Sequence, residues 1–83
     1  MNAPAPTPTS IASRMETALP SERREALREC ARAVAELWRM KRLSHRQRNE
    51  WVNALQNWGQ NRGGMRWSEA STEIIRGMKE GSQ

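Results

Sequence analysis

The sequence predicts an all-α protein: a small three-helix domain, made of a helical hairpin plus a third helix, that follows a disordered Pro-rich N-terminal tail. A length of 83 residues leaves room for one domain only. Apolar residues recur at three- and four-residue steps in three segments, which is the period of amphipathic helices, and no segment alternates like a strand. We therefore expect a single helical domain over residues 11–83.

The N-terminal tail is predicted from composition. Residues 1–10 contain three of the four prolines, alternating with small residues, and such a segment cannot bury enough apolar surface to fold. In residues 11–19, the apolar side chains of Ile11, Met15 and Leu19 stand four apart. This spacing suits either a weak helix or an extended strap, and a proline ends the segment.

The first strong helix is expected over residues 22–42. Ser21 can act as its N-cap, and Leu27, Val34 and Trp38 belong to one apolar stripe that runs along several turns. The other side of this segment mixes arginines with glutamates. Such a row is typical of a solvated helix face, whose ion pairs contribute only a few tenths of a kcal/mol each.

The second helix is expected over residues 45–58. Ser44 stands three residues before a glutamine, the spacing of a capping box, in which each side chain bonds to the backbone amide of the other residue. Trp51 and Trp58 fall in one narrow sector of this helix. We expect them to interlock with Trp38 of the first helix in the core.

A glycine-containing loop and a third helix complete the fold. Gly59 is a natural helix stop, so residues 59–68 are predicted to form a loop. The third helix is expected over residues 69–80, with Ile74 on its apolar side. Gly77 lies inside this helix and costs about 1 kcal/mol relative to alanine.

Positive charge is concentrated in one short segment. The chain has a net charge of +5, and residues 1–38 and 49–83 each sum to zero, so the whole excess lies in residues 39–48. The dipole of the first helix favours cations at its C-terminal end, but Arg46 and Arg48 lie in the first turn of the second helix, where cations are disfavoured. Breaking a local rule in this way often marks a binding site. Free helix amides beside several cations suit a phosphate group.

Amide side chains extend this basic segment along the second helix. Asn49 and Asn53 lie on the face opposite the tryptophans, although asparagine is a mediocre helix former. Asparagine can bridge adenine in the major groove and arginine can bind guanine, so this face could read the bases of a nucleic acid. DNA suits the face better than RNA. The alternative is an ordinary polar face without a ligand. The hypothesis is a helix-turn-helix-like basic corner. Its predicted nucleic-acid-binding residues are Arg39, Lys41, Arg42, His45, Arg46, Arg48, Asn49 and Asn53.

A protein-interaction module that modulates a host protein is the alternative function. The basic segment could equally contact an acidic protein surface, with Arg62, Arg66 and Trp67 as further partner-binding residues. Trp67 could cover the edge of the core, stack on a base or anchor a partner protein. A homodimer is also compatible with the sequence, because burial by three short helices barely balances the entropy of ordering them.

The residue inventory argues against an enzyme. The chain has no Asp, no Gly-rich phosphate loop followed by Lys, and no nucleophile with a recognisable base, so we expect no catalytic residue and no cofactor. A single cysteine, Cys30, and a single histidine, His45, cannot form a zinc site, so no metal is expected. Cys30 lies on the apolar stripe of the first helix and is expected to be inert.

The chain is expected to be cytoplasmic and not to associate with membranes. It lacks an apolar run near the about 18 residues that a membrane span requires, and its first residues do not resemble a secretion signal. A role at a membrane surface would need the tryptophans outside the core, whereas they occupy the side that the core requires.

Residues 28–75 contain the motifs R-E-C-A-R, then R-x-R-x-x-W-V-x-x-L, N-R-G-G and a closing I-I. In these motifs the chain resembles small, uncharacterised helical proteins encoded by bacteriophages. Those proteins tend to carry a Glu-Cys…Ala-Arg helix, an Arg-rich second helix and an Arg-Gly turn. The resemblance implies an accessory role in a phage or mobile element, and it transfers no functional residue.

Overall fold

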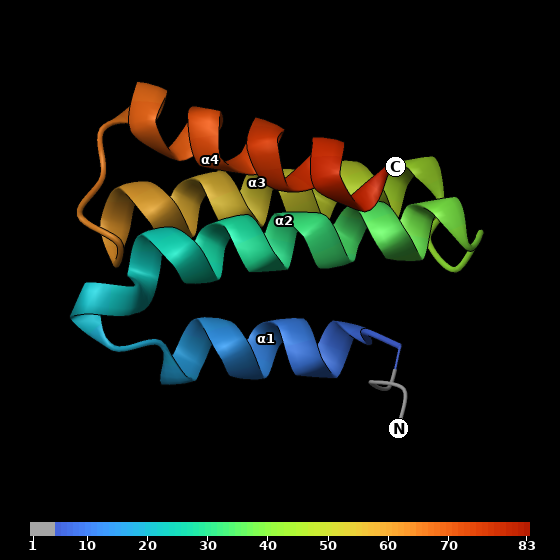
Figure 1. Ribbon diagram of the computed structural model, residues 1–83, viewed down its shortest axis with the longest axis horizontal. Coiled ribbons are helices and arrows are strands. Elements are labelled where there is room, and N and C mark those ends of the chain that lie inside the picture. Colours follow the sequence, from blue (N-terminus) through green and yellow to red (C-terminus); the bar gives the residue numbers. More distant parts are fainter. Residues whose placement is uncertain (1–4) are drawn as a thin grey trace.

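The computed structural model describes residues 5–83, and these residues form four α-helices and a short 3-10 helix without any β-strand. Figure 1 shows α2 in the middle of the molecule, with α1 along one side and α3 and α4 along the other. The all-α prediction is confirmed, whereas the described residues form one α-helix more than the three predicted. The elements are α1 (Pro8–Thr17), η1 (Pro20–Glu22), α2 (Arg23–Arg39), α3 (His45–Asn61) and α4 (Trp67–Gly81).

The additional helix, α1, corresponds to the helical alternative for residues 11–19, but it begins inside the predicted tail and ends at Thr17. The Ser10 amide donates to Thr7 Oγ1 at 3.0 Å and the Thr7 amide donates to Ser10 Oγ at 2.9 Å, which forms a capping box. Pro8 occupies the first helical turn, where its missing N–H costs nothing. Ile11 is buried and holds the helix on α2. The prediction of disorder over residues 1–10 is therefore wrong from Pro8 onwards, and its first four residues lie outside the described part of the chain.

The other helix boundaries differ by a few residues from those predicted. α2 ends three residues earlier than expected, whereas α3 continues past Gly59. A Cβ at Gly59 would lie 3.0 Å from both Ala70 Cβ and Leu27 Cδ2, so this glycine lies inside the helix at a tight contact with α2 and α4 and does not end the helix. α4 begins at Trp67, which makes the connection shorter than the predicted loop over residues 59–68.

The core is built from aliphatic side chains, and the tryptophans lie at its edge. Trp51 and Trp58 are partly buried and pack against the core, as expected. Trp38 instead lies at the end of α2 against His45, so the predicted interlocking of three tryptophans is wrong for this residue. The largest fully buried side chains are Leu27, Leu37, Leu55, Val34 and Cys30.

α2 and α4 approach each other so closely that their backbones nearly touch. A Cβ added at Gly77 would lie 2.2 Å from the Arg28 carbonyl oxygen, and one at Gly81 would lie 2.4 Å from the Arg32 carbonyl oxygen. Two alanines of α2 face these glycines. The interface therefore requires small residues on both helices, and it fixes where α4 lies on the molecule.

Cys30 supplies a test of how α1 packs. Its side chain is 2% exposed, its thiol lies 3.8 Å from the Ile11 carbonyl oxygen, and burial raises the pKa of the thiol from 9.0 to about 11. Because the folded state favours the neutral thiol, this contribution to stability is complete below pH 9 and is lost as the pH rises to about 11.

Between these two pH values, the free energy of unfolding of the unchanged protein should fall by about 1.4 kcal/mol per pH unit more than that of the Cys30→Ala variant, which has no thiol to ionise. Urea denaturation of both proteins between pH 8 and about 11 measures the difference. Parallel pH profiles for the two proteins would contradict burial of the thiol under α1.

Candidate nucleic-acid interface

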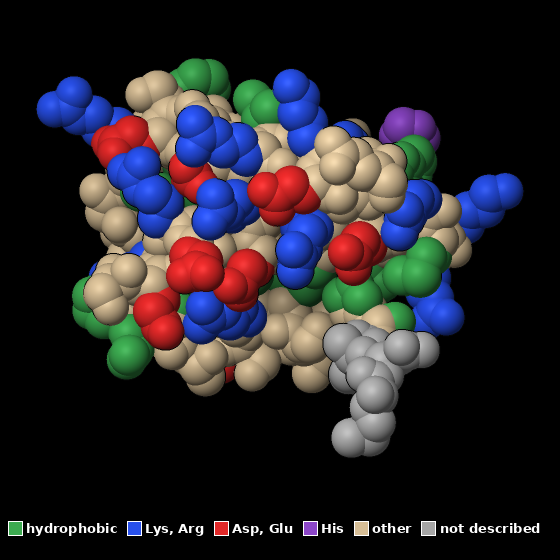
Figure 2. Space-filling view, viewed as in Figure 1, with side chains coloured by type: hydrophobic (Ala, Val, Ile, Leu, Met, Phe, Trp, Pro, Cys, Tyr) green, Lys and Arg blue, Asp and Glu red, His purple; other side chains and the backbone are tan. Residues whose placement is uncertain are grey.

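The cations of residues 39–48 meet at the end of the molecule where α2 turns into α3. We call Arg39, Lys41, Arg42, His45, Arg46 and Arg48 the basic corner. Figure 2 shows Lys and Arg side chains projecting from this end, at the right of the view. α2 and α3 run side by side in opposite directions in Figure 1, so the corner is the tip of a helical hairpin. The helices of a helix-turn-helix instead cross at roughly 90–120°.

The turn of the corner is a Schellman motif with an unusual residue. The Lys41 amide donates to the Trp38 carbonyl oxygen at 3.0 Å, and the Arg42 amide donates to that of Leu37 at 2.9 Å. Lys41 itself has φ 59°, a left-handed conformation in which glycine is the usual residue. A lysine thus occupies a conformationally unfavourable position, and its side chain is exposed at the tip of the hairpin.

The start of α3 is capped as predicted. The Gln47 amide donates to Ser44 Oγ at 3.1 Å, and the Ser44 amide donates to Gln47 Oε1 at 2.9 Å. The capping box uses the Ser44 and Gln47 amides, so an anion at this end of the helix would meet the amides of His45 and Arg46.

Carboxylates neutralise little of the basic corner. Arg46 Nε lies 3.2 Å from Glu50 Oε1, and both side chains are largely exposed, so this pair contributes little and is easily exchanged. Arg39 Nη1 donates to the main-chain oxygen of Gln83 at 2.7 Å. Within residues 5–83, the other cations of the corner form no ion pair, and none of the corner is paired with a carboxylate of α4.

Arg48 is held against the protein. Its guanidinium carbon lies 5.8 Å from the centroid of the Trp38 ring, a cation–π geometry, and the Trp38 and His45 rings lie 4.5 Å apart at 58°. Arg48 Nε is buried and has no hydrogen-bond partner in the described structure. The structure thus separates Arg48 from the exposed cations. This contact joins two helices across a turn and could not be inferred from residue spacing.

The amide face continues from the corner along α3. Asn49 and Asn53 are exposed, as is Asn57 one turn further along. Asn49 Oδ1 accepts a long hydrogen bond of 3.4 Å from Arg48, while the side chains of Asn53 and Asn57 make none with the described residues. The donors and acceptors of this face are therefore free to bind a ligand.

Gln56 is not part of this exposed face. Its Oε1 accepts a hydrogen bond of 3.0 Å from Ser71 Oγ, and its Nε2 donates to the Trp67 carbonyl oxygen at 3.2 Å. The Gln56 side chain therefore connects α3 to α4, and its amide group is already hydrogen-bonded within the protein.

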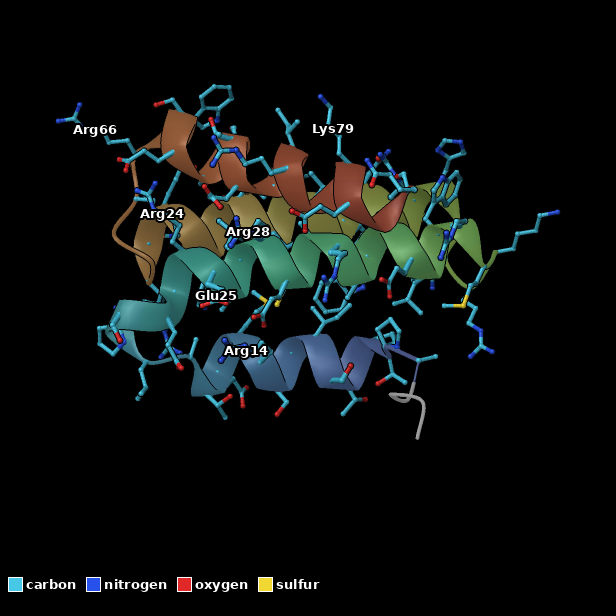
Figure 3. All side chains as sticks on the ribbon, viewed as in Figure 1. Arg14, Arg24, Glu25, Arg28, Arg66 and Lys79 are labelled. Carbon is cyan, nitrogen blue, oxygen red and sulfur yellow. The ribbon has the colours of Figure 1, made fainter. Side chains whose placement is uncertain are left out.

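The predicted partner-binding residues lie at the opposite end of α3 from the basic corner. Arg62 is the C-cap of α3 and Arg66 is the N-cap of α4, and Trp67 follows with 64% of its surface exposed. Figure 3 shows Arg66 projecting from this end. Because a helix of 17 residues is about 25 Å long, the length of α3 separates these residues from the exposed cations of the corner.

Comparisons with known proteins assign no function to these surfaces. No protein-family model, no curated protein and no solved structure matches the chain. Among residues 5–83, no group of three or more His, Cys, Asp or Glu side chains is placed to hold a metal ion. No helix of this part is long and apolar enough to cross a membrane.

Proposed function

We propose that this protein is a small nucleic-acid-binding accessory protein that binds duplex DNA through the basic corner and the outer face of α3. The observation that carries this proposal is the continuity of the two features. The segment that carries the whole net charge of the chain ends in the first turn of α3, and a row of exposed amide side chains continues along that helix. The resemblance to phage-encoded helical proteins favours a role in a phage or mobile element.

The exposed cations are the proposed phosphate ligands. Lys41, Arg42 and Arg46 project from the tip of the hairpin and can exchange water or Glu50 for phosphate oxygens. Arg39 contributes charge at the edge of the same site. Arg48, which packs on Trp38, supports the turn from which these cations project.

The amide row supplies the proposed base contacts. From Arg46 to Asn57, the helix advances about 16 Å, and a B-DNA major groove about 12 Å wide admits an α-helix. Asn49 and Asn53 lie between these positions on the exposed face. Phosphate contacts would dominate the affinity, while the asparagines would supply any preference for adenine.

A salt titration tests the proposal. With about four phosphate contacts, the affinity for a fluorescein-labelled duplex of about 20 base pairs should fall roughly a hundredfold between 50 and 200 mM salt. Arg42→Ala with Arg46→Ala should weaken binding about tenfold or more and reduce the salt slope by nearly two. Fluorescence anisotropy measures both quantities.

The matched control is Arg24→Ala with Arg62→Ala, which removes the same net charge at the far end of the molecule. It should retain most of the affinity, because only local contacts with phosphates determine the slope. Equal losses in the two double variants, or an affinity insensitive to salt, would refute the proposed interface.

A further inference from the structure

Exposed apolar residues mark a second surface, on α4 and the adjoining side of α3. Trp67 and Ile75, both on α4, are 64% and 57% exposed, and they stand eight residues or about 12 Å apart along the helix. Val52 of α3 and Met78 of α4 are partly buried and pack against the core. We call Arg48, Val52, Trp67, Ile75, Met78 and Lys79 the α3–α4 face.

A shallow, open groove lies at one end of this face. It has a volume of about 640 Å³ and is lined by Ile75 and Met78 together with Arg48, Lys79 and the last two residues of the chain. Figure 3 shows Lys79 pointing from α4 away from α2. The groove thus combines apolar walls with two cations, which suits an occupant that is both apolar and acidic.

The carboxylates of α4 all lie on its other side, towards α2. Glu69 bonds to the Arg66 amide and to Arg24 of α2, contacts that lower its pKa, and Glu73 is buried beside Arg76. Glu80 lines a hollow with residues of α2. The carboxylates of α4 therefore do not compete for the cations of the α3–α4 face.

We propose that the α3–α4 face docks an acidic amphipathic helix of a partner protein. The apolar side of such a helix would cover Trp67, Ile75 and Met78, and its carboxylates would meet Lys79 and Arg48. Nucleic acid does not require exposed aliphatic side chains. A membrane surface would require a longer apolar stripe flanked by many more cations. The α3–α4 face shares Arg48 with the basic corner but includes none of the exposed cations proposed as phosphate ligands, so it does not depend on them.

Peptide selection tests the proposal without knowledge of the partner. Random 20-residue peptides are selected against nucleic-acid-free protein, and enriched peptides are synthesised and titrated against it by calorimetry. We expect enrichment of Asp and Glu with apolar residues at helical spacing, and at least tenfold weaker binding to Trp67→Ala, to Ile75→Ala and to Lys79→Glu. Leu19→Ala, which removes an apolar residue that is also 60% exposed but far from this face, should bind like the unchanged protein.

Chemical-shift changes in labelled protein locate the bound peptide, and they should centre on the α3–α4 face. Selected peptides that carry no acidic bias, that bind the Trp67→Ala protein equally well or that perturb another surface would overturn the proposal. So would tight binding of vesicles containing anionic lipid in the absence of peptide binding, which would identify a membrane surface as the occupant. Circular dichroism of each variant confirms that the helices remain formed.

Discussion

Replacing Gly77 by alanine is expected to lower the free energy of unfolding by about 2–3 kcal/mol, although alanine is the better helix former. The gain in helix propensity is about 1 kcal/mol. Against it, the new Cβ would lie 2.2 Å from the Arg28 carbonyl oxygen and 2.8 Å from Ala31 Cβ. The obstacle is backbone in the middle of α2, so α4 must move away and lose packing along its length. The clash therefore outweighs the propensity.

Urea denaturation followed by circular dichroism measures this loss. Thr72→Ala is the matched control, because Thr72 is an exposed residue of α4 and its replacement by a better helix former touches no other helix. We expect little change or a slight gain in stability from the control. A Gly77→Ala protein more stable than the unchanged one would show that α2 and α4 do not approach so closely.

Local sequence signals predicted most of the helices. The stripe containing Leu27 and Val34 placed α2, and the spacing of Ser44 and Gln47 placed the start of α3, because each signal arises within one helix or one turn. The charge count located the basic segment for a similar reason. Residues 39–48 are contiguous, so any short turn between two helices keeps their side chains at one end of the molecule.

The misjudged elements depend on contacts between segments or on ambiguous residues. Pro8 belongs to a segment whose composition predicts disorder, but a proline is also favourable in the first turn of a helix, here one that Thr7 caps. From the local sequence, Gly59 is indistinguishable from a glycine that ends a helix, and Gly77 from one that merely weakens a helix. Only the opposing backbone and side chains show that both are packing positions, and these cannot be identified from one segment alone.

Contacts between helices also give some candidate site residues surroundings that the sequence does not predict. Nothing in the sequence indicates that Arg48 packs over Trp38, or that Lys79 and Arg48 line the same groove. The sequence placed Trp67 in a loop with an open role, and the structure leaves it exposed at the start of α4. The candidate site residues are thus predictable where they are contiguous in the sequence, and unpredictable where residues of α3 and α4 come together.

The second large effect is expected at Leu27, which is fully buried and touches α3 at Gly59. Leu27→Ala should lower the free energy of unfolding by about 3 kcal/mol, because it removes buried methyl groups and leaves a cavity in a small core. A domain of this size has about 5 kcal/mol of stability, so a measurable fraction of the variant should unfold well below the melting temperature of the unchanged protein. Denaturant titration followed by tryptophan fluorescence gives the value.

Gly59→Ala distinguishes this packing from a generic loss of apolar area. When Gly59→Ala is the only substitution, the new Cβ would lie 3.0 Å from both Leu27 Cδ2 and Ala70 Cβ. This crowding should offset most of the helix propensity gained. In the Leu27→Ala background, the first of these obstacles is gone and the new methyl group occupies part of the cavity. We expect the double variant to be more stable than the sum of the single effects predicts, by about 1 kcal/mol. Additive effects would mean that Leu27 and Gly59 are not in contact, and that α2 and α3 pack differently at this point.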